Sequence, residues 1–141
     1  MSPFARRAVS ALTCLTAAAL ATAAPAASAT PATEQGVKSI QLQWASASPA
    51  DPPHLNGYLT IGGTYTCTEP TGTTVDVSFT AMQILPLAMP SGVGSLPCGP
   101  GVVDASWEVT SVANAEVHRG WTNVFLTFDG QTALPQQLDA A

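Results

Sequence analysis

Apolar and polar residues alternate with a period of two through several segments of the chain. This period places successive side chains on opposite faces of a strand, so it predicts half-buried β-strands. The clearest prediction covers residues 59–67, where threonines alternate with the inward-facing set Leu59, Ile61, Gly63, Tyr65 and Cys67. A shorter strand is predicted over residues 40–44, with Ile40, Leu42 and Trp44 sharing the buried face.

Three further segments show the same alternation, at residues 75–79, 103–109 and 121–128. The turn sequence Pro70-Thr71-Gly72 lies between two of the predicted strands and favours a hairpin there. Residues 86–101 are rich in proline and glycine, which predicts a long loop containing a short strand near residues 93–96.

These elements predict an all-β fold, because no stretch after the N-terminal segment keeps a helical period over three turns. Five to seven short strands separated by turns are typical of a sandwich or barrel. We expect an immunoglobulin-like antiparallel β-sandwich over residues 37–130, with one disulfide. Residues 30–36 are expected to be a flexible segment and residues 131–141 a C-terminal tail.

The first 29 residues have the composition of a secretory signal peptide. Two arginines, Arg6 and Arg7, precede an uncharged stretch of alanine, leucine and threonine, and Ala27-Ser28-Ala29 provides small residues for cleavage. Basic, apolar and cleavage regions in this order predict export from the cell. An uncleaved anchor and a lipoprotein modified at Cys14 are the alternatives. The stretch is weakly hydrophobic for a membrane span, and Thr13 fits poorly before a lipidated cysteine.

Removal of the signal peptide makes the chain more acidic. The full sequence of 141 residues carries four Lys and Arg against nine Asp and Glu. Only Lys38 and Arg119 would remain beside the same nine acids, so the net charge falls to two minus nine, or −7. Such a chain lacks the basic surface that nucleic acids and anionic membranes require. We expect neither partner, and no membrane span after the signal peptide.

The mature chain would retain two cysteines, Cys67 and Cys98. An even pair in an exported protein predicts one disulfide. Together with His54 and His118 these cysteines could alternatively bind a metal, but their spacing does not resemble a zinc motif. Free or intermolecular thiols are the third possibility. We expect no metal and no cofactor.

The segment Gly63-Thr64-Tyr65-Thr66-Cys67 resembles the G-T-Y-x-C strand of small secreted actinobacterial proteins of unknown function. Those proteins continue with a second cysteine, a tryptophan and a closing strand, to which Cys98, Trp107 and residues 122–128 correspond in order. The resemblance implies an immunoglobulin-like sandwich and an extracellular location. It implies no catalytic residues.

Candidate catalytic residues are few. His54 and His118 are the only histidines, and no serine lies in a G-x-S-x-G motif. The acids Glu69, Asp76, Asp104 and Glu108 are spread over outward strand positions, where carboxylates keep a sheet face hydrated. No run of acids resembles a calcium loop. We therefore expect a protein that is not an enzyme, with a small hydrolase using a histidine as one alternative.

A second alternative is a protease inhibitor acting through residues 85–97. Secreted subtilisin-inhibitor-like proteins are similar in size and export but hold their reactive loop with a second disulfide. This chain has one cysteine pair, so its loop is less constrained.

Trp121 and Phe125 are the candidate binding residues. Trp44 and Trp107 each share a face with aliphatic side chains, which predicts that both are core residues. Trp121 and Phe125 instead share a face with Asn123 and Thr127, so that face is expected to be exposed. We expect a monomeric secreted module that binds an extracellular protein or glycan there.

Overall fold

The computed structural model describes residues 35–141, in which every regular element is a β-strand. The predicted signal peptide, residues 1–29, lies outside the described residues. The eight strands are β1 (Lys38–Ser48), β2 (Tyr58–Cys67), β3 (Thr74–Gln83), β4 (Ser91–Pro97), β5 (Ala105–Thr110), β6 (Gly120–Phe128), β7 (Gln131–Thr132) and β8 (Gln136–Ala140). The prediction of an all-β fold is confirmed.

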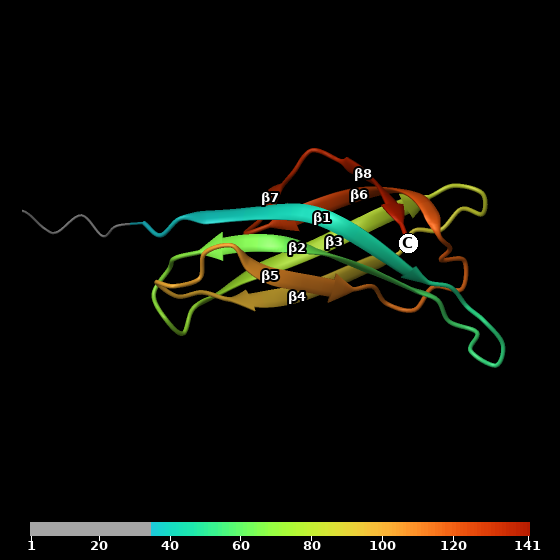
Figure 1. Ribbon diagram of the computed structural model, residues 1–141, viewed down its shortest axis with the longest axis horizontal. Helices are drawn as coiled ribbons and strands as arrows, with labels where there is room; N and C mark the ends of the chain where they lie inside the picture. Colours follow the sequence, from blue (N-terminus) through green and yellow to red (C-terminus); the bar gives the residue numbers. More distant parts are fainter. Residues whose placement is uncertain (1–34) are drawn as a thin grey trace, which may run out of the picture. The chain divides into compact units, whose positions relative to one another are not determined.

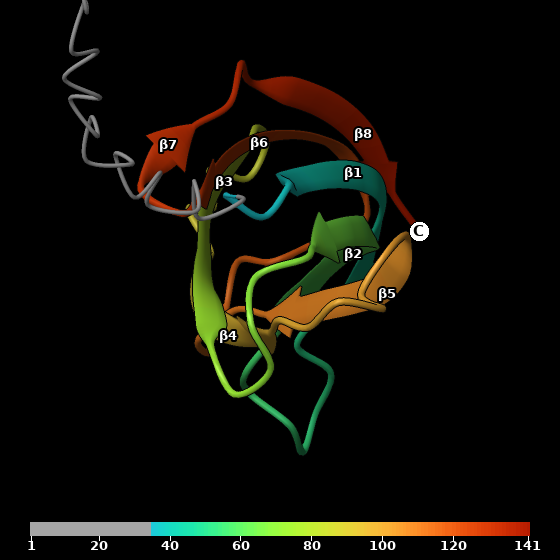
Figure 2. The same cartoon turned by 90° about the vertical axis from the view of Figure 1, so that its left-hand side faces the viewer.

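The strands form one sheet in the order β4-β3-β6-β8-β1-β2-β5, with β7 paired to β6. Figure 1 shows the strands running along the long axis of the unit, and Figure 2 shows the sheet curling around its own interior. The two halves of the resulting sandwich, β4-β3-β6-β8 and β1-β2-β5, meet where β1 pairs with β8. This is the one parallel pairing among the described strands; the others are antiparallel.

The two halves of the sandwich are joined at both ends near the free edges of the sheet, β4 and β5. At one end the Val112 N–H donates a 2.8 Å hydrogen bond to the Ser91 carbonyl. At the other end the Cys67–Cys98 disulfide joins the end of β2 to the residue after β4, with 4.9 Å between the Cα atoms. The predicted disulfide is confirmed, and it links the two halves of the sandwich. An immunoglobulin-like topology stays a prediction.

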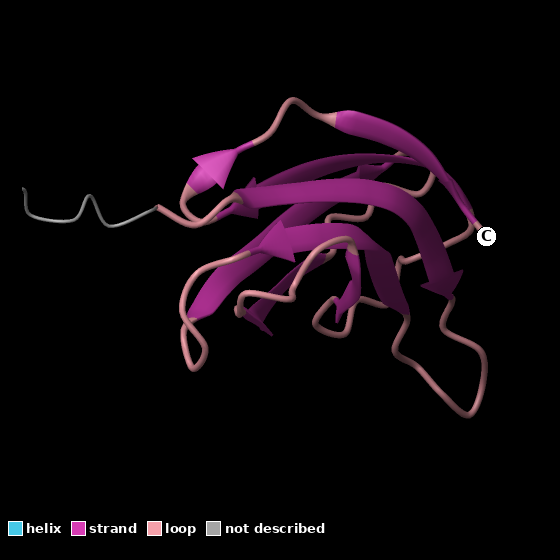
Figure 3. Cartoon of the chain, turned by 60° about the vertical axis from the view of Figure 1, so that its left-hand side comes forward, coloured by secondary structure: helices cyan, strands magenta, loops and turns pink. Residues whose placement is uncertain are grey.

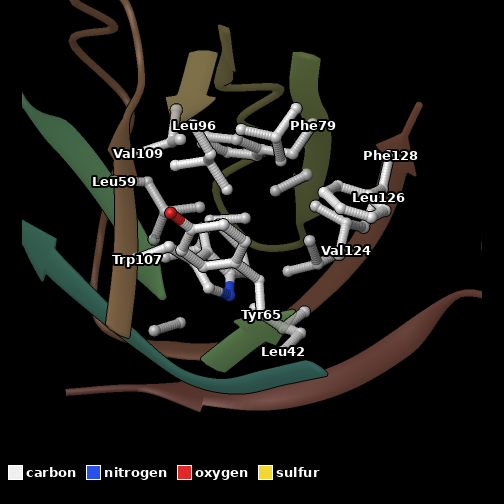
Figure 4. Packing of buried hydrophobic residues seen from close by; sticks show 14 of the residues in the cluster. Leu42, Leu59, Tyr65, Phe79, Leu96, Trp107, Val109, Val124, Leu126 and Phe128 are labelled. Carbon is white, nitrogen blue, oxygen red and sulfur yellow. The ribbon is translucent and has the colours of Figure 1, made fainter. Parts of the chain in front are cut away.

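The interior is filled by side chains from the inner faces of both halves, as Figure 4 shows. The inward sets predicted for β2, β3 and β6 are confirmed, because their members are buried: Leu59, Ile61, Tyr65, Cys67, Val75, Val77, Phe79, Thr122, Val124, Leu126 and Phe128. Trp107 is 4% exposed, which confirms its assignment to the core. Its indole N–H lies 3.2 Å from the carbonyl oxygens of both Gln41 and Thr64.

The predicted hairpin between β2 and β3 is wrong. The Pro70-Thr71-Gly72 turn connects them, but β2 pairs with β1 and β5, whereas β3 pairs with β4 and β6. The chain crosses from one half of the sandwich to the other at this turn. The hairpin lies one step later, between β3 and β4. Turn residues predict a change of direction, but they do not determine which strand becomes the neighbour.

The prediction of a tail over residues 131–141 is also wrong. This segment forms β7, which pairs with the end of β6, and β8, which pairs with both β6 and β1. Figure 3 draws the segment that ends at the C-terminus as a strand. Ala140 is fully buried in the core. Short strands with one buried residue carry little apolar pattern, so the segment resembles a polar tail in sequence.

Two expected core residues are exposed. Trp44 lies on the outer face because a β-bulge between Leu42 and Trp44 shifts the register of β1. A bulge adds one residue to a strand, so every later side chain changes face. Val103 is exposed because β5 begins only at Ala105.

Candidate functional site

Trp121 and Phe125 both point outward from β6, an inner strand of the sheet between β3 and β8. Trp121 is 67% exposed and Phe125 is 40% exposed, so the expected exposure of this face is confirmed. Asn123 lies between them on the same face, and the two aromatic residues are therefore about 13 Å apart along the strand. Exposed aromatic side chains on a central strand add little to the core.

Polar side chains surround these two aromatic residues. Trp121 is opposite Asp139 on β8, and Phe125 is opposite Thr80 on β3. The intervening Asn123 has Gln137 as its partner on β8. A ligand that covered the aromatic side chains would therefore find hydrogen-bonding groups beside them, as in binding surfaces with an apolar centre and a polar rim.

The loop from Ile84 to Pro90, between β3 and β4, continues this surface with apolar side chains. Four of its residues are exposed: Ile84, Leu85, Leu87 and Met89. Leu85, at the tip, is 89% exposed and has a positive φ of 63°. Clustered large apolar side chains on a soluble domain usually mark an interaction site.

The base of this loop is held in place. Gln83 and Ala88 exchange two backbone hydrogen bonds of 2.9 and 3.1 Å, which leave a four-residue turn at the tip. The fully buried Gln83 amide donates to the Thr122 hydroxyl at 2.9 Å and to the His118 carbonyl, and its oxygen accepts from the His118 N–H at 3.1 Å. The buried Gln83 side chain thus connects β3 to β6 and to the loop that precedes β6.

The loop and the aromatic face meet at one corner of the sandwich. Gln83 and Thr122 are the last paired residues of β3 and β6, and the next residues outward are Ile84 and Trp121. We call this surface the Trp121 corner and define it as Trp121, Phe125, Ile84, Leu85, Leu87 and Met89. Its base is hydrogen-bonded, so the backbone that carries the apolar loop is held beside β6.

The ion pairs lie at the opposite end of the sandwich, at the start of β1. Lys38 Nζ lies 3.0 Å from Asp129 Oδ2 and 3.7 Å from Glu69 Oε1, and these are the ion pairs of residues 35–141. The hydrogen bond to Asp129 raises the pKa of Lys38. Glu69 is therefore engaged in an ion pair. Glu69 and Asp104 lie outside the strands, not at the expected strand positions, whereas Asp76 lies on β3 and Glu108 on β5.

The histidines do not form a catalytic arrangement within the described residues. The His54 backbone N–H donates to the Asp51 carbonyl, and His118 Nδ1 lies 3.0 Å from the Glu116 carbonyl oxygen. Neither ring pairs with a serine hydroxyl or a carboxylate there. In the same part of the chain no three His, Cys, Asp or Glu side chains cluster in a way that could hold a metal ion.

The loop considered for protease inhibition differs from its expected form. Residues 91–97 form strand β4, so only residues 84–90 are loop, and residues 84–87 form a tight turn. A protease binds its inhibitor as an extended segment lying along the active-site cleft. The closed turn does not present such a segment, so the geometry does not favour inhibition by this loop.

The apolar loop is the part of the site that the sequence analysis missed. Its signal is the run from Ile84 to Pro90, in which apolar residues do not alternate with polar ones. Such a run normally indicates a buried strand, but two prolines interrupt it and prevent regular pairing. An apolar run that cannot be a strand is therefore a candidate for an exposed apolar loop.

No protein family, curated protein or solved structure is found to match this chain. Within residues 35–141 there is also no helix of the length and hydrophobicity needed to cross a membrane. The fold and the Trp121 corner are therefore the basis for a functional proposal.

Proposed function

We propose that the chain is a secreted, non-enzymatic binding module that attaches to an extracellular or cell-envelope partner through the Trp121 corner. The observation that carries the proposal is the exposure of Trp121 beside an apolar loop whose base is fixed by Gln83. Exposing these groups to water is costly, and binding removes that cost by covering them.

Export is supported by two independent features. The sequence pattern of residues 1–29 is that of a signal peptide, and the Cys67–Cys98 disulfide is consistent with an oxidising compartment. The binding role fits the hydrogen-bonded base of the loop, because a backbone that is already ordered loses little conformational entropy when a partner docks.

The proposal is tested with the fragment 30–141, which contains the whole compact unit. Purified fragment is mixed with washed cell walls, chitin or cellulose, and the fraction that pellets is measured. We expect pelleting with at least one of these envelope materials. The variants Trp121→Ala and Leu85→Ser should each reduce that fraction about ten-fold, since buried aromatic and aliphatic anchors dominate binding energies.

The matched control is Val103→Ser, which also removes an exposed apolar side chain but lies at the opposite end of the sandwich. It should pellet like the unmodified fragment. Circular dichroism must show that all variants remain folded. Equal pelleting of the Trp121→Ala variant and the unmodified fragment would refute the role of this corner, and unfolding of that variant would show that Trp121 is structural.

A further inference from the structure

We propose a second binding site, on the outer face of β1, β2 and β5, that takes one pyranose ring of a neutral saccharide. Its residues are Trp44, Ser106 and Glu108, which line an open hollow of about 320 Å³ together with Gly63 and Trp107. The site lies on different strands from the Trp121 corner and does not depend on the function proposed for that corner.

The β-bulge in β1 creates the aromatic wall of this hollow. Leu42 pairs with Gly63 and Trp44 pairs with Gly62, so Gln43 is the additional residue. Both Gln43 and Trp44 consequently face outward, whereas Leu42 and Ala45 on either side are buried. Without the bulge, Trp44 would point into the core. Bulges often redirect a side chain in this way near functional sites.

Gly62 leaves the space in which the Trp44 indole lies. A Cβ atom at residue 62 would overlap Cζ2 and Cε2 of Trp44, so the indole covers the space that a side chain would occupy. The ring therefore rests against the β2 backbone and remains 40% exposed. A large aromatic ring with one side supported by the sheet and one edge exposed is suited to contact with a flat apolar surface.

Hydrogen-bonding groups lie next to this ring. Glu108 is the residue of β5 paired with Gly62, and Ser106 is paired with Thr64. Both side chains are exposed and point to the same outer face as Trp44. On the β1 side, the Gln43 amide donates to the Thr64 hydroxyl at 3.3 Å. A carboxylate, hydroxyls and an amide around an aromatic ring match a ligand with one apolar face and several hydroxyl groups at its edge.

The charge of the hollow selects among such ligands. Glu108 takes part in neither ion pair of residues 35–141, because both belong to Lys38. Neither cationic residue of that range, Lys38 or Arg119, lines the hollow, so phosphates and uronic acids would meet uncompensated negative charge. A quaternary ammonium ion would favour several aromatic walls, whereas one exposed ring is present. The charge thus disfavours anionic ligands, and the aromatic ring with its surrounding hydrogen-bonding groups favours a neutral sugar.

The test is a titration of the ¹⁵N-labelled fragment 30–141 with cellohexaose and chitohexaose, followed by NMR. We expect shifts of the Trp44 indole N–H and of the Gly62, Ser106 and Glu108 amides for at least one of these sugars. Trp44→Ala should abolish the shifts. Glu108→Gln should weaken binding about ten-fold, because a hydrogen bond to a charged acceptor is stronger than one to a neutral amide. Trp44→Phe is the second variant if Trp44→Ala does not fold, and it should weaken binding.

Val93→Ser is the control, because it removes an exposed apolar side chain from β4, outside both proposed sites, and it should bind both sugars like the unmodified fragment. Shifts confined to Trp121 and Phe125 would overturn this second site while supporting the Trp121 corner. If neither sugar caused shifts, the proposed site at Trp44 would be overturned, while the proposal for the Trp121 corner would be unaffected. Binding of oligogalacturonate as tight as that of the neutral sugars would also overturn it, because the charge argument would fail.

Discussion

Trp44 packs directly on Gly62, and its indole can lie there only because residue 62 has no side chain. The indole lies where a Cβ atom of residue 62 would be, and the Trp107 carbonyl oxygen is also close to that point. The contact places one side of an exposed tryptophan against the backbone of the sheet.

Gly62→Ala should therefore displace the Trp44 indole and destabilise the fold by about 1–3 kcal/mol, as overpacking does. The displacement can be read from the chemical shift of the Trp44 indole N–H, and the stability from urea unfolding. Gly101→Ala is the control, because nothing lies within 4 Å of a Cβ atom there. An unchanged Trp44 signal in Gly62→Ala would contradict the contact.

Removing the disulfide with the double substitution Cys67→Ala and Cys98→Ala should lower the free energy of unfolding by about 3–4 kcal/mol. The bond closes a loop with a sequence separation of 31 residues and joins the two halves of the sandwich where β4 and β5 approach. Thermal unfolding followed by circular dichroism should show a decrease of at least about 10 °C. A midpoint within about 2 °C of the unmodified fragment would argue against this role.

Gln83→Ala should destabilise the fold by about 2–4 kcal/mol, because it removes three hydrogen bonds and leaves the buried partners unpaired. Hydrogen exchange should increase in residues 84–90 and 117–120 before it increases elsewhere. Thr122→Val removes one of these bonds and should cost about 1 kcal/mol. Uniform exchange across the whole chain in Gln83→Ala would show that the side chain does not hold the loop specifically.

Leu85→Gly should stabilise the fold by about 1 kcal/mol and still weaken binding to the envelope material. Leu85 has a φ of 63°, a conformation that costs a non-glycine residue free energy, and its exposed side chain makes little compensating contact. A gain in stability together with a loss of binding would show that the leucine side chain contributes to binding and not to the stability of the fold. A loss of stability would mean that the leucine side chain supports the loop.

Deletion of residues 134–141 should prevent folding at 37 °C. The deletion removes β8, exposes the edges of β6 and β1, and removes the buried Ala140. Aggregation and loss of the β-sheet circular dichroism signal are expected, since unpaired strand edges associate. A soluble truncated fragment with the melting temperature of the intact one would show that β8 is dispensable.

Much of the core could be predicted from the sequence because β2, β3 and β6 keep a strict alternation. The position of Trp44 could have been inferred from a change of phase within β1. Ile40 and Leu42 occupy even positions, whereas Ala45 and Ala47 occupy odd ones, so an additional residue must lie between the two pairs. The inward residues in the second half of β1 are alanines, and because alanine is small they do not stand out as an apolar alternation.

The Trp121 corner could be predicted only in part. The polar neighbours of Trp121 and Phe125 indicated an exposed face, which is local information. The link to the apolar loop depends on the pairing of Gln83 with Thr122, residues far apart in sequence. Strand order determines such contacts, and the turn residues that favoured a β2–β3 hairpin do not encode that order.

The parallel contact between β1 and β8 determines how the domain would respond to mechanical load. The Ala47 N–H donates to the Ala141 carbonyl at 2.8 Å, and the Ala141 N–H donates to the Ala45 carbonyl at 3.2 Å. A force that pulls the start of β1 away from the end of β8 acts along both strands, because they run in the same direction. It therefore strains these hydrogen bonds in shear, all at once, instead of opening them one after another.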